Sequence, residues 1–421
     1  MKFFLSLSKI VLFLSISFTF SCSSGSGDAK PAPAVNPDVV TKPTLTPIQK
    51  QDGVFNEFGS VQKFEWVPTG YSKDFVYDIY YYIPTSIQNS NNSPALVFMH
   101  GGGASTINRE GSNKAVNIYM KEVVAAAEKY KFIAILPSAN GLNWSGHTQR
   151  ILGELAQLLR EHLNFDTNRL GLSGHSMGGM GITRTFTHLV NDYSFVNSIS
   201  SAMNDATQTD ARLSKMYNIK YSHQLGLKDH FTDFVIWTKK LEANVKDMEE
   251  RHNKKSQFEM EWFDDGHVYT SAQTKKLESL FKGQRKIFQN ELFGEIYFDI
   301  KAYTENAINY TVLGSKRYLW MENMATTVSD HFQFEATVKN NIVNVNFFKD
   351  EDGYTIYPKS KKFKIYVSSK IFDLTKDIVV YDEGYFITRY IAKSKADLKP
   401  GLIDKDDPNT AYDDVFEFTF N

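Results

Sequence analysis

Residues 174–179 read Gly-His-Ser-Met-Gly-Gly and contain a G-x-S-x-G pattern at Gly174, Ser176 and Gly178. An apolar run precedes the pattern and a helical pattern follows it, which is typical of a strand-turn-helix that holds a serine in a tight, exposed turn. Glycines are needed there because a Cβ at either flanking position would collide with the neighbouring strand or helix. The backbone N–H of Met177 would begin the helix and face an oxyanion. The pattern therefore predicts a nucleophilic Ser176.

A second glycine-rich turn follows the apolar run at 95–99 and contains Gly101, Gly102 and Gly103. Glycines at such a position let backbone N–H groups face a developing negative charge without obstruction by side chains. A glycine-rich turn is often only a turn, but this one lies a helix-strand-helix-strand unit upstream of the serine. We therefore expect these glycines to form an oxyanion hole together with Met177.

A serine hydroxyl needs a base to remove its proton, and that base needs a carboxylate to orient it. On a strand-turn-helix of this kind the order along the chain is serine, acid and histidine, each on a loop after a strand. We expect His267 to be the base, because it follows a strand predicted at 258–263, at the last strand end before a closing helix. We expect Asp229 to be the acid, because it follows a strand predicted at 219–223. The competing carboxylates are Asp233, Asp264 and Asp265, and the less well placed histidines are His175, His223, His230 and His252.

The elements that must position these residues alternate along the chain from about residue 54. Strands are predicted at 75–84, 95–99, 132–136, 169–173, 195–199, 219–223 and 258–263. Helical periods lie at 114–130, 151–163, 180–190, 235–252 and 271–288. Strands that alternate with helices indicate a mostly parallel, doubly wound sheet covered on both faces.

Short alternating runs replace the helical periods after about residue 292. Strands are predicted at 332–338, 342–348, 363–367 and 416–420, with turns at Asp352-Gly353 and Glu383-Gly384. This pattern predicts a C-terminal all-β, sandwich-like domain. We therefore divide the chain into a leader at 1–21, a flexible tether at 22–52, an α/β domain at 53–290 and a β-rich accessory domain at 291–421.

The composition is that of a folded protein without a polyanionic partner. The 421 residues are 42% apolar and 23% charged, and 47 Lys and Arg balance 48 Asp and Glu. A balanced charge of this kind does not favour binding to nucleic acid.

The single cysteine, Cys22, cannot form an internal disulfide. It follows the apolar run 10–20 and Ser21, and a stretch rich in Gly, Pro, Ala and Thr comes after it. This arrangement resembles a bacterial lipoprotein signal, in which the cysteine becomes the lipidated first residue. A free thiol, or an ordinary signal peptide cleaved nearby, is the alternative. We expect a protein anchored by lipid at Cys22 in the bacterial cell envelope, at the outer membrane or cell surface, or a secreted one.

The residues assembled above resemble those of α/β-hydrolases of the polyhydroxybutyrate depolymerase, feruloyl esterase and acetyl xylan esterase type. The resemblance spans about residues 75–285 and is most specific at the serine turn with its lead-in Asp166-Thr-Asn-Arg169. The segment 136–144, which ends at Trp144, and the acid and base loops also match, although Leu225 stands where such enzymes usually carry a histidine. The resemblance implies a serine hydrolase of carboxylic esters that needs no metal or organic cofactor, with Trp144 as a wall of the substrate site.

The expected partner is an ester substrate on a polysaccharide or in a polyester. A serine peptidase on the same fold and an inactive polymer-binding surface protein are the alternatives. Aromatic residues of the β region would suit stacking on sugars, or they belong to its core; these are Tyr318, Trp320, Tyr354 and Tyr357. The acidic stretch 404–409 and Asp413-Asp414 lack the spacing of a calcium loop, which favours solvated loops.

Overall fold

The computed structural model describes residues 59–68, 76–102, 108–141, 144, 148–208, 210–283, 291–296, 317–318, 321–323, 332–348, 361–382, 385–391, 402–403 and 411–420. Several predictions fall outside these ranges: the leader, the tether and its Cys22, Gly103, three of the aromatic residues (Trp320, Tyr354, Tyr357) and the acidic stretch 404–409. Among the described helices, none is both long and apolar enough to cross a bilayer.

An eight-stranded, mostly parallel sheet forms the centre of the first region, as predicted. Its spatial order is β1-β2-β4-β3-β5-β6-β7-β8. The strands are β1 (Val61–Trp66), β2 (Tyr77–Tyr82), β3 (Ala95–Met99), β4 (Ile133–Pro137), β5 (Leu170–His175), β6 (Phe195–Ile199), β7 (Lys220–Gly226) and β8 (Phe258–Phe263). Strands β3 to β8 run parallel, whereas β1 and β2 are antiparallel to their neighbours. The sequence analysis did not predict β1.

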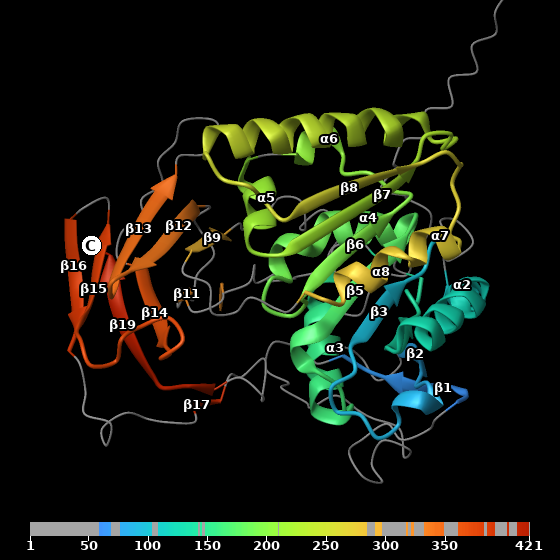
Figure 1. The fold of residues 1–421 in the computed structure, drawn as a ribbon, viewed down its shortest axis with the longest axis horizontal. Coiled ribbons are helices and arrows are strands. Elements are labelled where there is room, and N and C mark those ends of the chain that lie inside the picture. The colour runs from blue at the N-terminus through green and yellow to red at the C-terminus, as the bar shows by residue number, and fades with distance from the viewer. Residues whose placement is uncertain are drawn as a thin grey trace, which may run out of the picture.

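Helices cover both faces of this sheet (Figure 1). The helices are α2 (Arg109–Tyr130), α3 (Thr148–His162), α4 (Met177–Thr185), α5 (Asp210–Leu213), α6 (Thr232–Arg251), α7 (Ser271–Thr274) and α8 (Lys276–Leu280). Alternate residues of β3 separate the two cores: Leu96 and Phe98 pack with α2 and α8, whereas Val97 and Met99 pack with α3, α4 and α6. The central strands are buried on both faces, which is why they read as continuous apolar runs.

Two helix boundaries differ from the predictions for physical reasons. Helix α2 begins at Arg109 rather than at residue 114, because the Asn108 side chain accepts a hydrogen bond from the Gly111 N–H and caps a polar first turn. The single helix predicted at 271–288 is instead two short helices, α7 and α8, that meet at Lys275.

The C-terminal strands form further sheets, as predicted, and gather beside the α/β region in orange and red in Figure 1. One sheet has the order β10-β11-β14-β19, another β16-β15-β13-β12-β9, and β17 pairs with β18. Their bounds are β9 (Glu291–Ile296), β10 (Arg317–Tyr318), β11 (Met321–Asn323), β12 (Phe332–Lys339), β13 (Ile342–Phe348), β14 (Lys361–Val367), β15 (Ile378–Asp382), β16 (Tyr385–Tyr390), β17 (Leu402–Ile403), β18 (Ala411–Tyr412) and β19 (Asp414–Phe420).

Large aromatic side chains of this region that the structure describes lie mostly in its core. Phe363 is fully buried, and its ring stacks on that of Phe418 at 5.9 Å between centroids. The carboxylate of Asp414 is also buried and accepts a hydrogen bond from the Tyr390 hydroxyl at 2.5 Å. Phe363, Phe418 and Tyr390 therefore contribute to the packing of this region.

Candidate active site

Ser176 lies between the end of β5 and the start of α4, in a backbone conformation that is rare for any residue other than glycine. Its φ is 54° and its ψ is −117°. The chain can turn this sharply because its neighbours lack side chains: a Cβ on Gly178 would lie 2.1 Å from the Met99 carbonyl oxygen, and one on Gly174 would lie 2.7 Å from the Gly178 backbone. Strained backbone of this kind concentrates at functional sites. The elbow predicted from the G-x-S-x-G pattern is therefore present.

The structure brings together the three residues predicted to cooperate. The Nε2 atom of His267 lies 2.8 Å from the Ser176 Oγ, and its Nδ1 atom lies 2.8 Å from the Asp229 Oδ2. The Asp229 side chain is fully buried, and the His267 side chain is 12% exposed. A carboxylate accepts only, so the His267 Nδ1 donates to Asp229, which leaves Nε2 to accept the hydroxyl proton of Ser176. This is the hydrogen-bonded relay that activates a serine.

The loops that carry the acid and the base are joined to each other directly. Strand β7 continues to Gly226, beyond its predicted end, and the Lys228 N–H donates to the Asp265 carbonyl oxygen at 2.9 Å. A Cβ on Gly226 would lie 2.3 Å from that same oxygen, so only glycine lets the loops approach so closely. The second carboxylate oxygen of Asp229 accepts from the Phe231 N–H at 2.9 Å, which fixes the acid in its turn.

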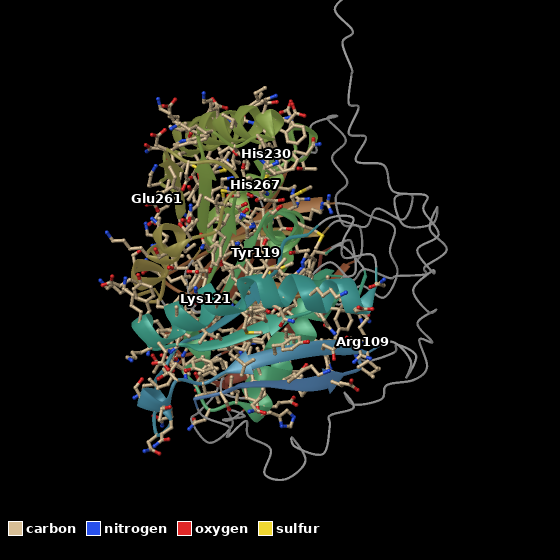
Figure 2. All side chains as sticks on the ribbon, turned by 90° about the vertical axis from the view of Figure 1, so that its right-hand side faces the viewer. Arg109, Tyr119, Lys121, His230, Glu261 and His267 are labelled. Carbon is tan, nitrogen blue, oxygen red and sulfur yellow. The ribbon has the colours of Figure 1, made fainter. Side chains whose placement is uncertain are left out.

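The competing residues are engaged elsewhere. The Asp264 carboxylate is exposed and pairs with Lys228 at 2.8 Å. The Nε2 atom of buried His223 lies 3.0 Å from the Ser201 carbonyl oxygen. His230, in contrast, lies next to the base. Its ring packs edge-on against that of His267 at 5.2 Å between centroids, and Figure 2 shows the two together above Tyr119.

The glycine turn lies beside the nucleophile. A Cβ on Gly101 would lie 3.0 Å from the Ser176 Cβ, so the backbone of this turn passes directly over the serine. Gly101 is buried and Gly102 is exposed, and Met177 opens α4, whose N-terminal N–H groups favour negative charge. Gly101 and Met177, two of the predicted oxyanion donors, therefore lie next to Ser176.

His100 supports this turn, a role that the sequence analysis missed. Its Nδ1 atom lies 2.8 Å from the Gly101 carbonyl oxygen, and its Nε2 accepts from the Ala139 N–H at 3.0 Å. Burial lowers the pKa of His100 to about 4, so the ring is neutral at working pH and Nδ1 is the donor. Trp144 donates from its indole to the His100 carbonyl oxygen at 2.8 Å and is only 2% exposed. It therefore braces the turn instead of forming the open substrate wall that the sequence suggested.

The order of the strands and the positions of the three residues decide the architecture. The nucleophile follows β5, the acid follows β7 and the base follows β8, with the glycine turn after β3. This combination of a nucleophile elbow and the chain order serine, acid, histidine distinguishes one fold among those that carry such triads. The fold is the α/β-hydrolase fold.

No protein-family model and no curated protein matches the chain. Among solved structures, it is similar to a thermostable esterase at 16% identity, with 53% of this chain and 63% of that chain covered and a TM-score of 0.40. It is similar to serine hydrolase F, a fluorophosphonate-binding enzyme of Staphylococcus aureus, at 16% identity over 53% of this chain and 99% of that chain, with a TM-score of 0.39. A poly(3-hydroxybutyrate) depolymerase from Bordetella parapertussis matches at 12% identity over 53% of this chain and 90% of that chain, with a TM-score of 0.40. A likeness at these identities does not show that this chain shares the activity or the substrate of those proteins.

A buried carboxylate anchors the helix that follows the glycine turn. Asp78, which is fully buried, accepts hydrogen bonds from Arg109 at 2.7 Å, Asn113 at 2.7 Å and Lys63 at 2.9 Å. Burial alone would raise the pKa of Asp78, but these hydrogen bonds outweigh it and hold the pKa at about 2. The sequence carries a signal for this contact that was not used. It is a lone aspartate in an aromatic strand, together with an arginine and an asparagine four residues apart on the helix.

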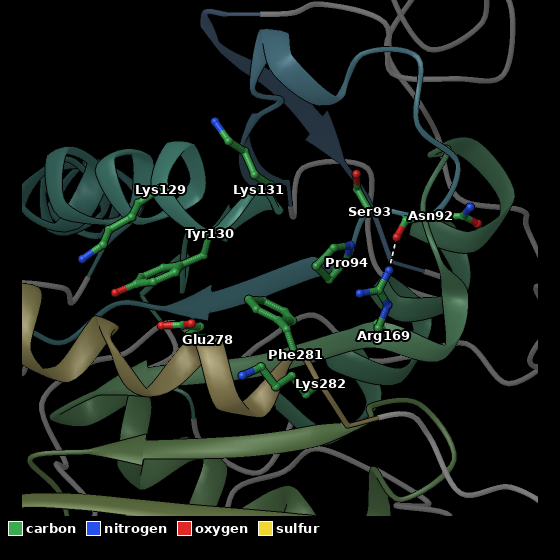
Figure 3. A pocket seen from close by; sticks show the side chains of 10 residues that line it. All are labelled: Asn92, Ser93, Pro94, Lys129, Tyr130, Lys131, Arg169, Glu278, Phe281 and Lys282. Atoms are coloured by element: carbon green, nitrogen blue, oxygen red, sulfur yellow. Dashed lines mark hydrogen bonds between the residues drawn. The ribbon is translucent and has the colours of Figure 1, made fainter.

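A cavity of about 620 Å³ lies at the opposite edge of the α/β-hydrolase sheet (Figure 3). Its lining includes residues that come just before the parallel strands. Pro94 precedes β3, Lys131 precedes β4 and Arg169 precedes β5. The triad lies at the other ends of these parallel strands. This cavity therefore does not open onto Ser176.

Proposed function

We propose that this protein is a serine hydrolase that cleaves carboxylic esters. The observation that carries the proposal is the hydrogen-bonded series from Asp229 through His267 to Ser176, with the serine on a strained elbow. Ser176 attacks the ester carbonyl carbon while its proton passes to the His267 Nε2. Asp229 stabilises the imidazolium that results. The protonated His267 then gives its proton to the departing alcohol, and water repeats the sequence on the acyl-enzyme.

The oxyanion of the tetrahedral intermediate is held by backbone N–H groups of Met177 and of the glycine turn. Each such donor is worth roughly 100- to 1,000-fold in kcat in serine hydrolases. Their placement at the start of α4 and beside the Ser176 Cβ supports this assignment.

Exposed apolar side chains beside the base support a substrate with an apolar or aromatic acyl group. Phe231 and Val268 are each 36% exposed. The Phe231 ring lies 4.9 Å from the His267 ring, in an edge-on arrangement. Such surface beside a nucleophile suits the acyl part of a feruloyl or similar ester on a polysaccharide, or the repeating unit of a polyester.

The test is a substrate panel read against Ser176→Ala. We expect the wild type to hydrolyse p-nitrophenyl acetate and a feruloyl ester, and the variant to lose at least roughly 10,000-fold in kcat. A matched control, Ser279→Ala on the exposed face of α8, should retain wild-type rates. Faster cleavage of peptides than of esters would favour the peptidase alternative. Absence of hydrolysis, with no labelling of Ser176 by a fluorophosphonate, would favour the polymer-binding alternative.

We further propose that the enzyme is exported and anchored to the cell envelope by a lipid on Cys22. The apolar run before Cys22 and the proline-containing stretch after it support this proposal. Mass spectrometry of the mature protein should find a diacylglyceryl group on this cysteine, and Cys22→Ser should release the protein from the membrane fraction. A mature N-terminus elsewhere would overturn the anchor without affecting the esterase proposal.

A further inference from the structure

His175, the residue before the nucleophile, is buried against the catalytic imidazole without taking part in the relay. It is 5% exposed, and its ring centroid lies 5.0 Å from that of His267 and 5.9 Å from that of Tyr269. Its Nδ1 atom lies 2.8 Å from the hydroxyl oxygen of Tyr119, which comes from the middle of α2. A hydrogen bond therefore links α2 to the strand end that carries Ser176.

The direction of this hydrogen bond follows from the two groups and from the backbone next to His175. Burial, followed by the nearby charge of His267, lowers the pKa of His175 to about 3. Burial raises the pKa of Tyr119 to about 12, although a backbone hydrogen bond at Gly101 acts against this rise. Tyr119 and His175 are therefore both uncharged at neutral pH. A backbone hydrogen bond at Val268 favours a proton on the His175 ring, and because Nδ1 faces the Tyr119 hydroxyl, this proton lies on Nε2. The Nδ1 atom then accepts the proton of the phenol.

The same hydroxyl also contacts the glycine turn. A Cβ on Gly101 would lie 2.4 Å from the Tyr119 Oη and 3.0 Å from the Ser176 Cβ. The Gly101 backbone is therefore enclosed between this hydroxyl and the nucleophile. The Tyr119 ring is itself fixed by packing against Phe98 at 5.4 Å and Tyr269 at 5.7 Å.

We propose that Tyr119 is a positioning residue, whose hydroxyl fixes the tautomer of His175 and holds the Gly101 backbone in place beside Ser176. The inference rests on the proposed function, because it concerns the reaction of Ser176. A neutral, fixed His175 matters when His267 becomes an imidazolium, because a second positive charge at 5.0 Å would oppose that step. A fixed Gly101 matters when the oxyanion forms, because donors that are already in place need no reorganisation.

The substitution that tests this is Tyr119→Phe, which removes the hydroxyl and retains the ring that packs on Phe98. We expect kcat for a p-nitrophenyl ester to fall roughly 10- to 100-fold, below the full loss of an oxyanion donor, with KM within twofold of the wild type. The rate of labelling by a fluorophosphonate should fall by the same factor. Tyr130→Phe, at the far end of α2, is the matched control and should retain wild-type kinetics.

A purely structural role would lower Tm and leave kcat per folded molecule unchanged, and that result would overturn the proposal. So would kinetics within twofold of the wild type. A second measurement does not depend on activity or on the folding of a variant: ¹⁵N NMR of the wild-type histidines should show His175 as the Nε2–H tautomer, uncharged from pH 5 to pH 9. An Nδ1–H tautomer would overturn the inference. Absence of any hydrolysis by the wild type would instead count against the proposed function.

Discussion

The carboxyl edge of the eight-stranded sheet, which carries Ser176, differs from the amino edge, which carries the cavity, in the ionisable side chains that each presents. At the carboxyl edge, Asp229, His100 and His175 are buried, and each is held by hydrogen bonds to neighbouring loops or helices. At the amino edge, Lys129 and Lys131 are exposed beside the 620 Å³ cavity. Buried polar groups are costly unless they are satisfied, so the buried acid and histidines beside Ser176 mark the chemistry better than the volume of the cavity does.

Among the residues that support Ser176, the buried acid of the carboxyl edge should have the largest effect. Asp229→Asn keeps the shape but replaces the oxygen that accepts from the His267 Nδ1 with a group that favours the wrong tautomer. We expect kcat to fall roughly 10,000-fold, with little change in KM, as measured on a p-nitrophenyl ester. Asp233→Asn, on the exposed first turn of α6, is the control. A loss of less than tenfold would mean that another carboxylate orients the base.

The local sequence pattern was sufficient to predict which residues form the hydrogen-bonded series of Ser176, His267 and Asp229. The strands before Ser176, Asp229 and His267 can each be predicted from the local sequence, and the fold places their ends at one edge. The chain order of nucleophile, acid and base then leaves few candidates. The structure places these three together.

The supporting contacts could not be predicted because they depend on how distant elements are rotated about their axes. Tyr119 meets His175 across 56 residues of sequence, and Arg109 meets Asp78 across 31. Neither pair follows a short spacing. The pairing of strands in the β region could not be predicted either. The alternating pattern predicted β13, but nothing in its sequence indicates that its partner β15 runs parallel to it.

A glycine substitution tests the tight packing of the carboxyl edge. A Cβ on Gly178 would lie 2.1 Å from the Met99 carbonyl oxygen, which is backbone and cannot rotate away. We expect Gly178→Ala to lower the free energy of unfolding by roughly 3 kcal/mol and to remove activity. Gly153→Ala on α3 is the matched control, because its nearest neighbour would be the Asp192 carboxylate at 3.6 Å. That variant should be neutral or slightly stabilised in urea unfolding, since alanine favours helix. Equal midpoints for the two variants would contradict the clash.

Asp78, the buried carboxylate that anchors α2, should make the stability of the fold depend on pH. The pKa of Asp78 is about 2 in the folded protein, below its ordinary value of 3.8. Its contribution is therefore present above pH 3.8 and is lost as the pH falls through 2. Its partners Lys63 and Arg109 are 42% and 39% exposed, so solvent screens part of the contribution and leaves roughly 1–2 kcal/mol.

The measurement is the urea midpoint of the wild type and of Asp78→Asn between pH 7 and pH 2.5. The variant should be less stable at neutral pH and should show a flatter decline below pH 5. Asp233→Asn should follow the wild-type curve. A wild-type slope retained in Asp78→Asn would assign the acid dependence to other carboxylates.

The smallest effect is expected at the amino edge. Lys129 and Lys282 line the cavity as exposed side chains, and the Lys129 ammonium lies over the Tyr130 ring at 5.0 Å. Replacing both with alanine removes only solvated charge, so unfolding free energy should change by less than roughly 0.5 kcal/mol and kcat by less than twofold. The double variant is measured with the same ester and urea assays as the others. A tenfold loss of kcat with unchanged stability would be informative, because the triad lies at the other ends of the strands and no shared contact would explain it. The cavity would then have to influence the reaction through the strands themselves, and the contrast between the two edges would fail.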